Sequence, residues 1–312
     1  MKTYALISPC RDEAEYMRVT IASVVAQTAR PTVWVIVDDG STDDSPRLLA
    51  DLAAEHDWVK VVTRTDRGKR AVGPGVIEAF YAGLETIDLD AFDYVCKFDL
   101  DLELPHDYFE RIMQRMEDNP RIGTCRGKPY YRDAGGQLVS EKCGDETSVG
   151  MIKFYRVACF RQIGGFVREV MWDGIDCHRC RMKGWIACSW DDPELRFIHL
   201  RPMGSSQQGI MTGRMRHGFG QYFMGTSPVY MTASAVYRMT RPPYVAGGVG
   251  MLLGYGKSAL EGEARYDDPE FRAFLRRYQR DCLLKGKARA TRELDRRMAA
   301  VWNPTLRGDT AL

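Results

Sequence analysis

Apolar and polar positions along the first 126 residues follow a repeating pattern typical of buried strands separated by amphipathic helices. Short apolar runs predict strands at residues 3–8, 32–37, 59–62, 94–98 and 122–125. Stretches with a helical period predict helices at residues 13–27, 43–55, 72–85 and 105–116. This alternation favours an α/β fold with a mostly parallel, Rossmann-like sheet flanked by helices, because right-handed crossovers place the helices on the sheet faces.

The pattern changes after residue 126. Residues 127–150 predict loops and short strands, and a helix at 175–183 and strands at 185–190 and 195–198 follow. Residues 199–220 are rich in Gly, Arg, Ser and Gln, which is typical of a mobile loop. We therefore expect a domain over 1–200 with two halves that meet at residue 126, a mobile loop over 201–220, and a helical C-terminal extension over 221–312.

Charge is distributed unevenly over the 312 residues. Residues 1–120 hold 13 Lys/Arg and 23 Asp/Glu, whereas residues 121–312 hold 31 and 19. An acidic half suits a metal site, and a basic half suits phosphate or an anionic membrane surface. The extension combines an apolar, aromatic stretch at 221–260 with a basic amphipathic region at 269–300, which suits peripheral membrane binding or packing on the core.

Cysteine usage and hydropathy indicate the compartment. Nine cysteines without a regular framework, and an N-terminus without a signal peptide, favour reduced thiols in a cytoplasmic protein. No run of about 18 apolar residues predicts a membrane-spanning helix. Cys177 and Cys180 form one C-x-x-C pair without a second, which favours packing over a zinc site.

Carboxylates stand where two of the predicted strands end. Asp38 and Asp39 follow one strand, and Asp99 and Asp101 follow another. Ligands of open α/β sheets bind at these strand ends. Asp38 and Asp39 suit ribose hydroxyls or a base N–H, although Asp39-Gly40 is also a common turn pair. Asp99 and Asp101 point to the same side of an extended segment, where a divalent cation such as Mg²⁺ would offset their repulsion. No G-x-G-x-x-G follows the first strands, which argues against a dinucleotide site.

Several spaced motifs in order make residues 1–190 resemble the family 2 inverting glycosyltransferases, which have the GT-A fold. The matching segments are Ser8-Pro9-Cys10-Arg11-Asp12-Glu13, Val37-Asp38-Asp39-Gly40-Ser41-Thr42-Asp43, Phe98-Asp99-Leu100-Asp101, Ile163-Gly164-Gly165-Phe166, and Trp172-Asp173 through Arg179 to Gly184-Trp185.

The resemblance implies a donor site in the first half, 1–126. Asp39 would contact the nucleobase, Pro9 and Glu13 would shape its pocket, and Asp99 would hold the ribose or the metal. Asp101 would ligate the metal, and His199 lies where GT-A enzymes often place a late metal ligand. Further expected donor contacts come from Arg11, Asp38, Lys69, Arg70 and Arg214.

The resemblance implies an acceptor site in the second half, 127–200. The turn Gly164-Gly165-Phe166 and Trp172 would line it, and Asp173 falls where the family places its general base. The family usually shows Glu-Asp there, whereas this chain has Trp172-Asp173-Gly174-Ile175-Asp176, so Asp176 is a rival base. A first-turn carboxylate favoured by the helix dipole is the alternative role for Asp176. The Gln-x-x-Arg-Trp motif of processive synthases is absent, which suggests transfer of a single sugar.

We therefore expect an enzyme that uses Mn²⁺ or Mg²⁺ to transfer a sugar from a nucleoside diphosphate-sugar. UDP or dTDP is favoured and GDP is the alternative. The acceptor would be a hydroxyl of a glycan or polyprenyl-linked molecule in cell-surface polysaccharide biosynthesis, reached from the cytoplasmic face of the membrane, with no nucleic-acid partner. The rival hypotheses are a sugar-1-phosphate nucleotidyltransferase, whose Gly-rich basic loop is missing, and a sugar-nucleotide-binding module without catalysis.

Overall fold

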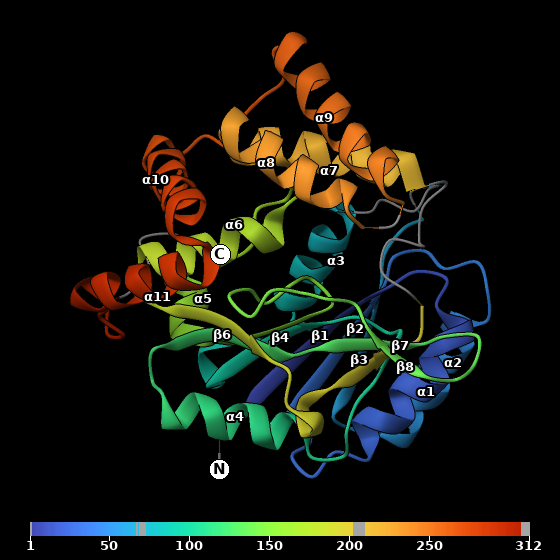
Figure 1. The fold of residues 1–312 in the computed structure, drawn as a ribbon. Coiled ribbons are helices and arrows are strands. Elements are labelled where there is room, and N and C mark those ends of the chain that lie inside the picture. Colours follow the sequence, from blue (N-terminus) through green and yellow to red (C-terminus); the bar gives the residue numbers. More distant parts are fainter. Residues whose placement is uncertain (1, 67, 69–72, 202–209, 242, 307–312) are drawn as a thin grey trace.

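A seven-stranded sheet forms the centre of the computed structural model, which describes residues 2–66, 68, 73–201, 210–241 and 243–306 (Figure 1). Its strands, in spatial order, are β10 (Ile186–Trp190), β6 (Ile122–Gly127), β9 (Ile152–Arg156), β4 (Tyr94–Phe98), β1 (Tyr4–Cys10), β2 (Val33–Asp38) and β3 (Val59–Thr63). Neighbours pair in parallel except at β9, which is antiparallel to both β4 and β6. The mostly parallel sheet expected from the sequence is thus confirmed.

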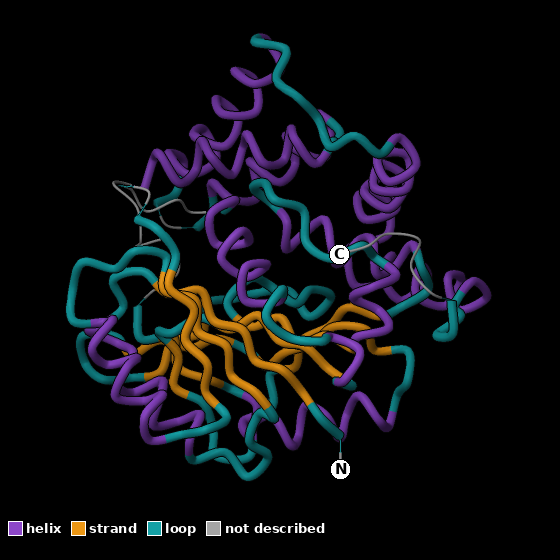
Figure 2. Tube along the Cα trace, turned by 180° about the vertical axis from the view of Figure 1, so that it is seen from behind, coloured by secondary structure: helices purple, strands orange, loops and turns teal. Residues whose placement is uncertain are grey.

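Helices cover both faces of this sheet, because successive side chains of each strand point to opposite sides. Tyr4 and Leu6 of β1 face one core with helices α1 (Ala14–Val25), α2 (Ser45–Glu55) and α4 (Tyr108–Asp118). Ala5 and Ile7 face the other core with α3 (Pro74–Leu84), α5 (Val157–Gln162) and α6 (Trp172–Met182). Figure 2 shows the two layers from behind. Short 3-10 helices connect elements at Leu89–Ala91, Pro193–Leu195 and Ala299–Val301.

A small second sheet brings distant residues to the edge of the first. Its order is β5 (Leu102–Glu103), β11 (Phe197–His199), β7 (Pro129–Arg132) and β8 (Leu138–Ser140). The antiparallel pairing of β11 with β5 sets His199 opposite Leu102, directly after Asp101. β9 and β10 come from the half expected at 127–200, yet they complete the sheet of the first half. The boundary at residue 126 therefore does not divide the fold.

Three packed helices, which we call the cap, lie above α3 and α6: α7 (Ile210–Met224), α8 (Pro228–Met239) and α9 (Val245–Leu260) (Figure 1). The loop expected over 201–220 is wrong for residues 210–220, which form α7; residues 202–209 lie outside the described ranges. Two of the glycines that suggest a loop here serve close packing instead. A Cβ on Gly218 of α7 would stand 2.1 Å from the Met251 carbonyl oxygen of α9, and a Cβ on Gly220 would stand 2.4 Å from the Met171 side chain; in return, a Cβ on Gly254 of α9 would stand 2.0 Å from the Met215 carbonyl oxygen of α7.

Two further helices complete the expected helical extension. α10 (Pro269–Lys285) and α11 (Lys287–Met298) meet at Gly286, whose φ of +79° suits glycine. Phe271 and Leu275 of α10 pack with Ile175 of α6 and Met224 of α7. In the part of the chain that the structure describes, no helix is long and apolar enough to cross a bilayer.

Candidate active site

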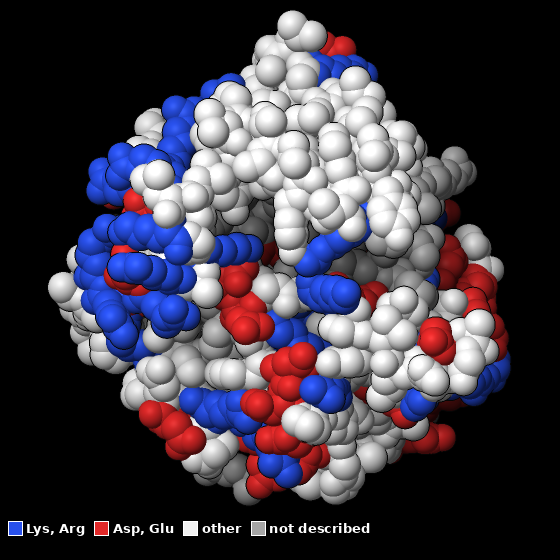
Figure 3. All heavy atoms as spheres, viewed as in Figure 1, with Lys and Arg blue, Asp and Glu red and all other residues white. Residues whose placement is uncertain are grey.

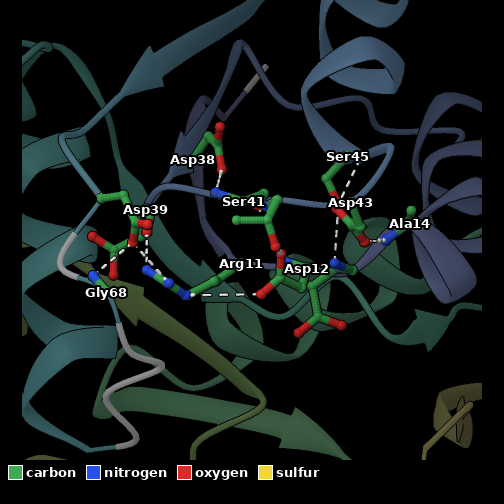
Figure 4. A network of polar contacts seen from close by, with 12 residues as sticks. Arg11, Asp12, Ala14, Asp38, Asp39, Ser41, Asp43, Ser45 and Gly68 are labelled. Carbon is green, nitrogen blue, oxygen red and sulfur yellow. Dashed lines mark hydrogen bonds and ion pairs between the residues drawn. The ribbon is translucent and has the colours of Figure 1, made fainter.

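Side chains and backbone amides tie the loops after β1 and β2 together at the carboxyl edge of the sheet (Figure 4). Asp38 accepts a hydrogen bond from the Ser41 N–H at 2.9 Å, and Asp12 accepts one from the Thr42 N–H at 2.7 Å. Asp43 accepts from the Ala14 N–H at 3.0 Å, so it joins this loop to the start of α1. Asp38 and Asp39 are similarly buried, at 4% and 5% exposed, and the Asp38 side chain also stabilises this turn, so its role as a donor contact stays a prediction.

Asp39 and Arg11 lie side by side in this loop (Figure 4). The Arg11 guanidinium donates to the Asp39 carbonyl oxygen at 2.6 Å and to the Asp66 carboxylate at 2.8 Å. Arg64 pairs with the Asp39 carboxylate at 2.9 Å. The two expected donor cations Lys69 and Arg70 lie outside the described residues. Pro9 lies in β1 opposite Val37 of β2, directly before this loop.

Acidic and basic side chains from several segments alternate in a network around Asp101, which follows β4. Arg201 bridges Glu13 and Asp101, with 2.9 Å from its Nη2 to each carboxylate. The His199 Nε2 lies 3.5 Å from the Asp101 carboxylate, and its Nδ1 lies 3.0 Å from that of Glu141. Asp99 pairs with Lys97 two residues earlier on the same strand. The structure thus gathers the expected residues Glu13, Asp99, Asp101 and His199 at one edge.

Burial and these partners set the protonation of the acidic cluster. Burial would lower the pKa of His199, but hydrogen bonds to Asp101 and Glu141 raise it to about 9. Burial would raise the pKa of Asp101, yet the hydrogen bond and charge of His199, followed by the charge of Arg201, lower it overall. His199 is therefore protonated at neutral pH while it holds these two carboxylates.

The donor atoms fit a hard divalent cation. Asp101 Oδ1 is buried and has no hydrogen-bond partner among the described residues, so an oxygen ligand is available there. Carboxylate oxygens of Asp99 and Asp101 with a His imidazole suit Mn²⁺ or Mg²⁺. In the described ranges no three His, Cys, Asp or Glu residues are arranged to hold a metal ion. Arg201 and His199 neutralise Asp101 in this arrangement, so the metal stays a prediction.

Gly150 connects the acidic cluster to Asp173. The Lys97 ammonium, which pairs with Asp99, donates to the Gly150 carbonyl oxygen at 2.8 Å. The N–H of Gly150 donates to the Asp173 carboxylate at 3.1 Å. Asp173 is partly exposed in the first turn of α6, one residue after Trp172. Gly150 therefore contacts both Lys97, the partner of Asp99, and Asp173, the expected base.

Asp173 opens into a cavity of about 620 Å³ between α6 and the C-terminal helices. Its lining combines residues of the loop before β9, such as Thr147 and Val149, with Arg214 and Gln221 of α7 and Tyr278 of α10. Figure 3 shows a recess between the cap and the sheet domain on this side of the molecule. Arg214, expected at the donor, lies in this cavity, whose lining does not include Asp39, Asp99 or Asp101 among the described residues.

Asp176 is not placed to act as a base, which corrects that alternative. Its carboxylate is 1% exposed and lies 2.7 Å from the Lys153 ammonium. The Tyr155 hydroxyl donates to it at 2.6 Å. Burial raises the pKa of Asp176 to about 6 even though Lys153 opposes this shift. No route to an acceptor remains for a carboxylate held in this way.

The turn expected on the acceptor side supports the cavity from below. Gly164 and Gly165 adopt φ near +67° and +68°, and Phe166 is buried. The Phe166 ring contacts Trp172 edge to face with centroids 4.9 Å apart. Trp172 lines the cavity, whereas Phe166 and the two glycines do not. The expectation is therefore wrong for Phe166, because its ring fills the core instead.

Sequence reasoning missed the lysines that organise both ends of the site. Lys97 and Lys153 are register partners on β4 and β9, and each pairs with one aspartate. Lys97 precedes Asp99 by two residues, so strand alternation already places the two on one side. Lys153 had no comparable signal, because its partner Asp176 lies 23 residues away.

Strand-end carboxylates on a mostly parallel sheet, with a cavity carboxylate beside them, form the arrangement that the sequence predicted for a glycosyltransferase with the GT-A fold. The model of the family described as "Glycosyl transferase family 2" matches residues 5–169, which is more than half of the chain. The protein is thus a glycosyltransferase of family 2, as the motifs predicted. This membership sets aside the nucleotidyltransferase hypothesis.

Curated relatives include poly-β-1,6-N-acetyl-D-glucosamine synthases. Those of Staphylococcus epidermidis (strain RP62A) and Staphylococcus aureus (strain COL) are each 26% identical over 130 residues. The match covers 41% of this chain and 29% of each relative. The matched region therefore spans under a third of the length of these relatives.

Solved structures share the fold. The mannosyltransferase PcManGT from Pyrobaculum calidifontis, in complex with GDP-Man and Mn²⁺, aligns with a TM-score of 0.51 and 17% identity over 96% of this chain and 86% of its own. TarS residues 1–349 from S. aureus, with UDP-GlcNAc, aligns at 0.51 and 14% over 96% and 91%. GalNAc-T7 with UDP, GalNAc and Mn²⁺ aligns at 0.58 and 12% over 91% and 58%. At these identities the likeness establishes the fold alone.

Proposed function

We propose that this enzyme transfers one sugar, with inversion, from a nucleoside diphosphate-sugar to a hydroxyl of a glycan or polyprenyl-linked acceptor in cell-surface polysaccharide biosynthesis. The donor nucleotides in the structural relatives, UDP and GDP, support a nucleoside diphosphate-sugar. Asp39, beside Arg11 and Arg64, suits an N–H of the base, and UDP or dTDP stays the favoured donor.

The observation that carries this proposal is the connection through Gly150. Its carbonyl contacts the lysine that holds Asp99, and its N–H contacts Asp173. Inverting transfer is a direct displacement, which needs the leaving group and the attacking hydroxyl on opposite sides of one carbon. Because both the carbonyl and the N–H of Gly150 are hydrogen-bonded, this residue links the acidic cluster to Asp173 and would hold the two sides at a fixed separation.

Each side then has its own chemistry. The Asp173 carboxylate takes the proton of the acceptor hydroxyl as that oxygen attacks the anomeric carbon. Trp172 forms part of the wall beside it and excludes water. Asp99 and Asp101 would hold Mn²⁺ or Mg²⁺, with His199 as a third ligand once its imidazolium has lost a proton, because a metal binds only the neutral ring. A cation bound there supplies charge stabilisation for the departing diphosphate.

Thermal-shift measurements test the donor site. We expect one nucleoside diphosphate, from UDP, dTDP and GDP, to raise the melting temperature only with Mn²⁺ or Mg²⁺. At about 100 Kd such a ligand stabilises the native state by roughly 2.7 kcal/mol. The control variant Asp118→Ala, which changes an exposed residue of α4, should show the same rise in melting temperature as wild type. The absence of any shift in wild type would refute the proposed donor site, and binding without turnover would favour a non-catalytic module.

We further propose that the cap rests on an anionic bilayer, as expected from the sequence of the extension. Large apolar side chains of α8, α9 and their connection are more than a third exposed, namely Val229, Val236, Tyr237, Tyr244, Val245, Val249, Leu253 and Leu260. Figure 3 shows this surface largely free of charge, with Lys and Arg gathered beside it over α10 and α11. An apolar surface with a basic flank matches the interior and the headgroups of an anionic membrane.

Co-sedimentation with vesicles tests this surface. We expect binding to vesicles that contain phosphatidylglycerol and weaker binding to pure phosphatidylcholine, with a loss of affinity at high salt. Leu253→Glu on α9 should reduce binding, whereas the matched control Leu138→Glu on β8 should not, since the two leucines are 55% and 50% exposed. Equal effects of the two variants would refute a role for the cap. The cytoplasmic location stays a prediction.

A further inference from the structure

The charges that line the cavity beside Asp173 do not balance. Lys287 pairs with Glu146, and Arg181 pairs with Asp295 at 3.0 Å, so these two cations are neutralised. Burial lowers the pKa of His178 to about 3 and of His217 to about 4, so both imidazoles are neutral at pH 7. The remaining charged groups of the described lining are Asp173, Arg214 and Arg216.

Arg214 and Arg216 have no ion pair or hydrogen bond with any described residue. The Nη1 of Arg216 is fully buried and lacks a partner. Burial lowers the pKa of both guanidinium groups, and no carboxylate raises either of them. The residues outside the described ranges contain one acidic residue, Asp309. Two arginines without a counter-ion are therefore held in a partly enclosed space, which is costly unless an anion joins them.

The position of these arginines favours the acceptor over the donor. They lie on α7 in a cavity that begins at Asp173 and extends toward Tyr278 and Gln279 of α10. Of the charged residues at the acidic edge, Asp39, Asp99, Asp101 and His199 are absent from the described lining. The diphosphate of the donor belongs at that edge, where the proposed cation ligands lie. The cavity therefore serves whatever molecule presents its hydroxyl to Asp173.

We propose that the cavity binds an acceptor that carries an anionic group, phosphate or carboxylate, and that Arg214 and Arg216 hold this group while Asp173 faces the acceptor hydroxyl. This inference rests on the proposed function and names the class of its acceptor. Guanidinium groups form paired, charge-assisted hydrogen bonds with phosphate and carboxylate oxygens, which fixes orientation as well as charge. A neutral sugar would leave both arginines uncompensated, so the site discriminates against neutral acceptors.

Binding of defined small anions tests this assignment. The probes are inorganic phosphate, glucose 1-phosphate, glucuronate and neutral glucose, titrated calorimetrically into the full chain with saturating nucleoside diphosphate and Mn²⁺ to fill the donor site. We expect anionic probes to bind and glucose not to bind. Glucose 1-phosphate and glucuronate distinguish a phosphate-bearing from a uronate-bearing acceptor. Arg216→Gln should weaken anion binding about tenfold or more, the usual effect of losing a charge-assisted hydrogen bond.

Two controls keep the result interpretable. Arg277→Gln removes an exposed arginine of α10 and should bind anions as wild type does. Arg214→Gln gives a second cavity variant should Arg216→Gln fold poorly, which thermal melting would show. In both cavity variants the Kd for metal-dependent binding of the nucleoside diphosphate should stay within about twofold of wild type. A twofold change in Kd corresponds to about 0.4 kcal/mol.

Four results would overturn the inference, the last being that wild type binds the nucleotide but no anion. One is unchanged anion affinity in both cavity variants, and another is equal binding of glucose and glucose 1-phosphate. The third is loss of nucleoside diphosphate binding in Arg216→Gln, which would assign the arginines to the donor. If wild type binds no nucleoside diphosphate with metal, the proposed function fails instead. If it binds the nucleotide but no anion, only this inference fails.

Discussion

Replacing Asp176 by Asn should destabilise the enzyme without changing its chemistry, whereas replacing Asp173 by Asn should remove transfer while leaving stability nearly unchanged. The two aspartates lie three residues apart on α6, and sequence alone allowed either to be the base. The structure separates them by environment. Asp176 is buried against Lys153 and Tyr155, while Asp173 borders the cavity.

The magnitude follows from what each substitution leaves behind. Asp176→Asn preserves the side-chain volume but leaves the fully buried Lys153 ammonium without the one carboxylate, at 2.7 Å, that pairs with it among the described residues. Breaking such a buried pair from one side typically costs about 3–5 kcal/mol. This is a large part of the roughly 5–15 kcal/mol that stabilises a typical protein. Asp173→Asn disturbs one hydrogen bond from the Gly150 N–H at a partly exposed site, so we expect about 1 kcal/mol or less.

Urea unfolding followed by circular dichroism measures the change in stability of each variant. Release of nucleoside diphosphate per folded molecule measures the change in transfer rate. Loss of a general base lowers the rate by about 10²–10⁴-fold. The double variant Lys153→Met/Asp176→Leu should recover stability relative to Asp176→Asn, because no unpaired charge remains. The reasoning is refuted if Asp176→Asn keeps its stability and loses transfer while Asp173→Asn stays active.

Three further predictions concern the acidic edge and the cap. Asp101→Ala should remove the metal-dependent part of donor stabilisation in a thermal-shift titration; an unchanged metal response would exclude Asp101 as a ligand. With EDTA present, the raised pKa of His199 means that its contribution to stability is complete below about pH 6.5 and is lost as pH rises through about 9; the rise in pKa corresponds to about 3 kcal/mol. His199→Gln should abolish this pH dependence of urea unfolding. Gly254→Ala should destabilise the cap by about 1–3 kcal/mol, because its Cβ would meet the Met215 carbonyl, whereas Gly256→Ala, with open space around it, should be tolerated in the same melting assay.

Local patterns were sufficient to predict six strands of the seven-stranded sheet and the carboxylates at their ends, but not β9 (Ile152–Arg156). The apolar run of strand β2 stops at Asp38, and Asp39 follows directly. Strand β4 likewise ends at Phe98, directly before Asp99. Such signals come from consecutive residues, so one segment carries all the information. The family motifs then predicted the fold and the roles of Asp101 and Asp173.

Tertiary contacts decided what the sequence could not. Asp38 and Asp39 are adjacent aspartates that the sequence does not distinguish. In the structure Asp38 accepts a hydrogen bond from the Ser41 N–H, whereas Asp39 pairs with Arg64. Helix α7 resembles a loop because of its glycines, and two of them are explained only by distant contacts: Gly218 packs on Met251 of α9, 33 residues later, and Gly220 packs on Met171, before α6. The bridge from Arg201 to Glu13 spans 188 residues, which no short pattern reports.

The antiparallel strand β9 has a consequence for synthesis on the ribosome. It lies between β4 and β6, and β10 joins the sheet only through β6. A nascent chain that has emerged up to residue 150 thus holds β1–β4 on one side and an unpaired β6 on the other. Until residues 152–156 arrive, the edges of β4 and β6 are exposed, and exposed edges favour association between chains. The same strand carries Lys153, so the newly closed sheet holds an ammonium without its partner until Asp176 of α6, 23 residues later, has also emerged.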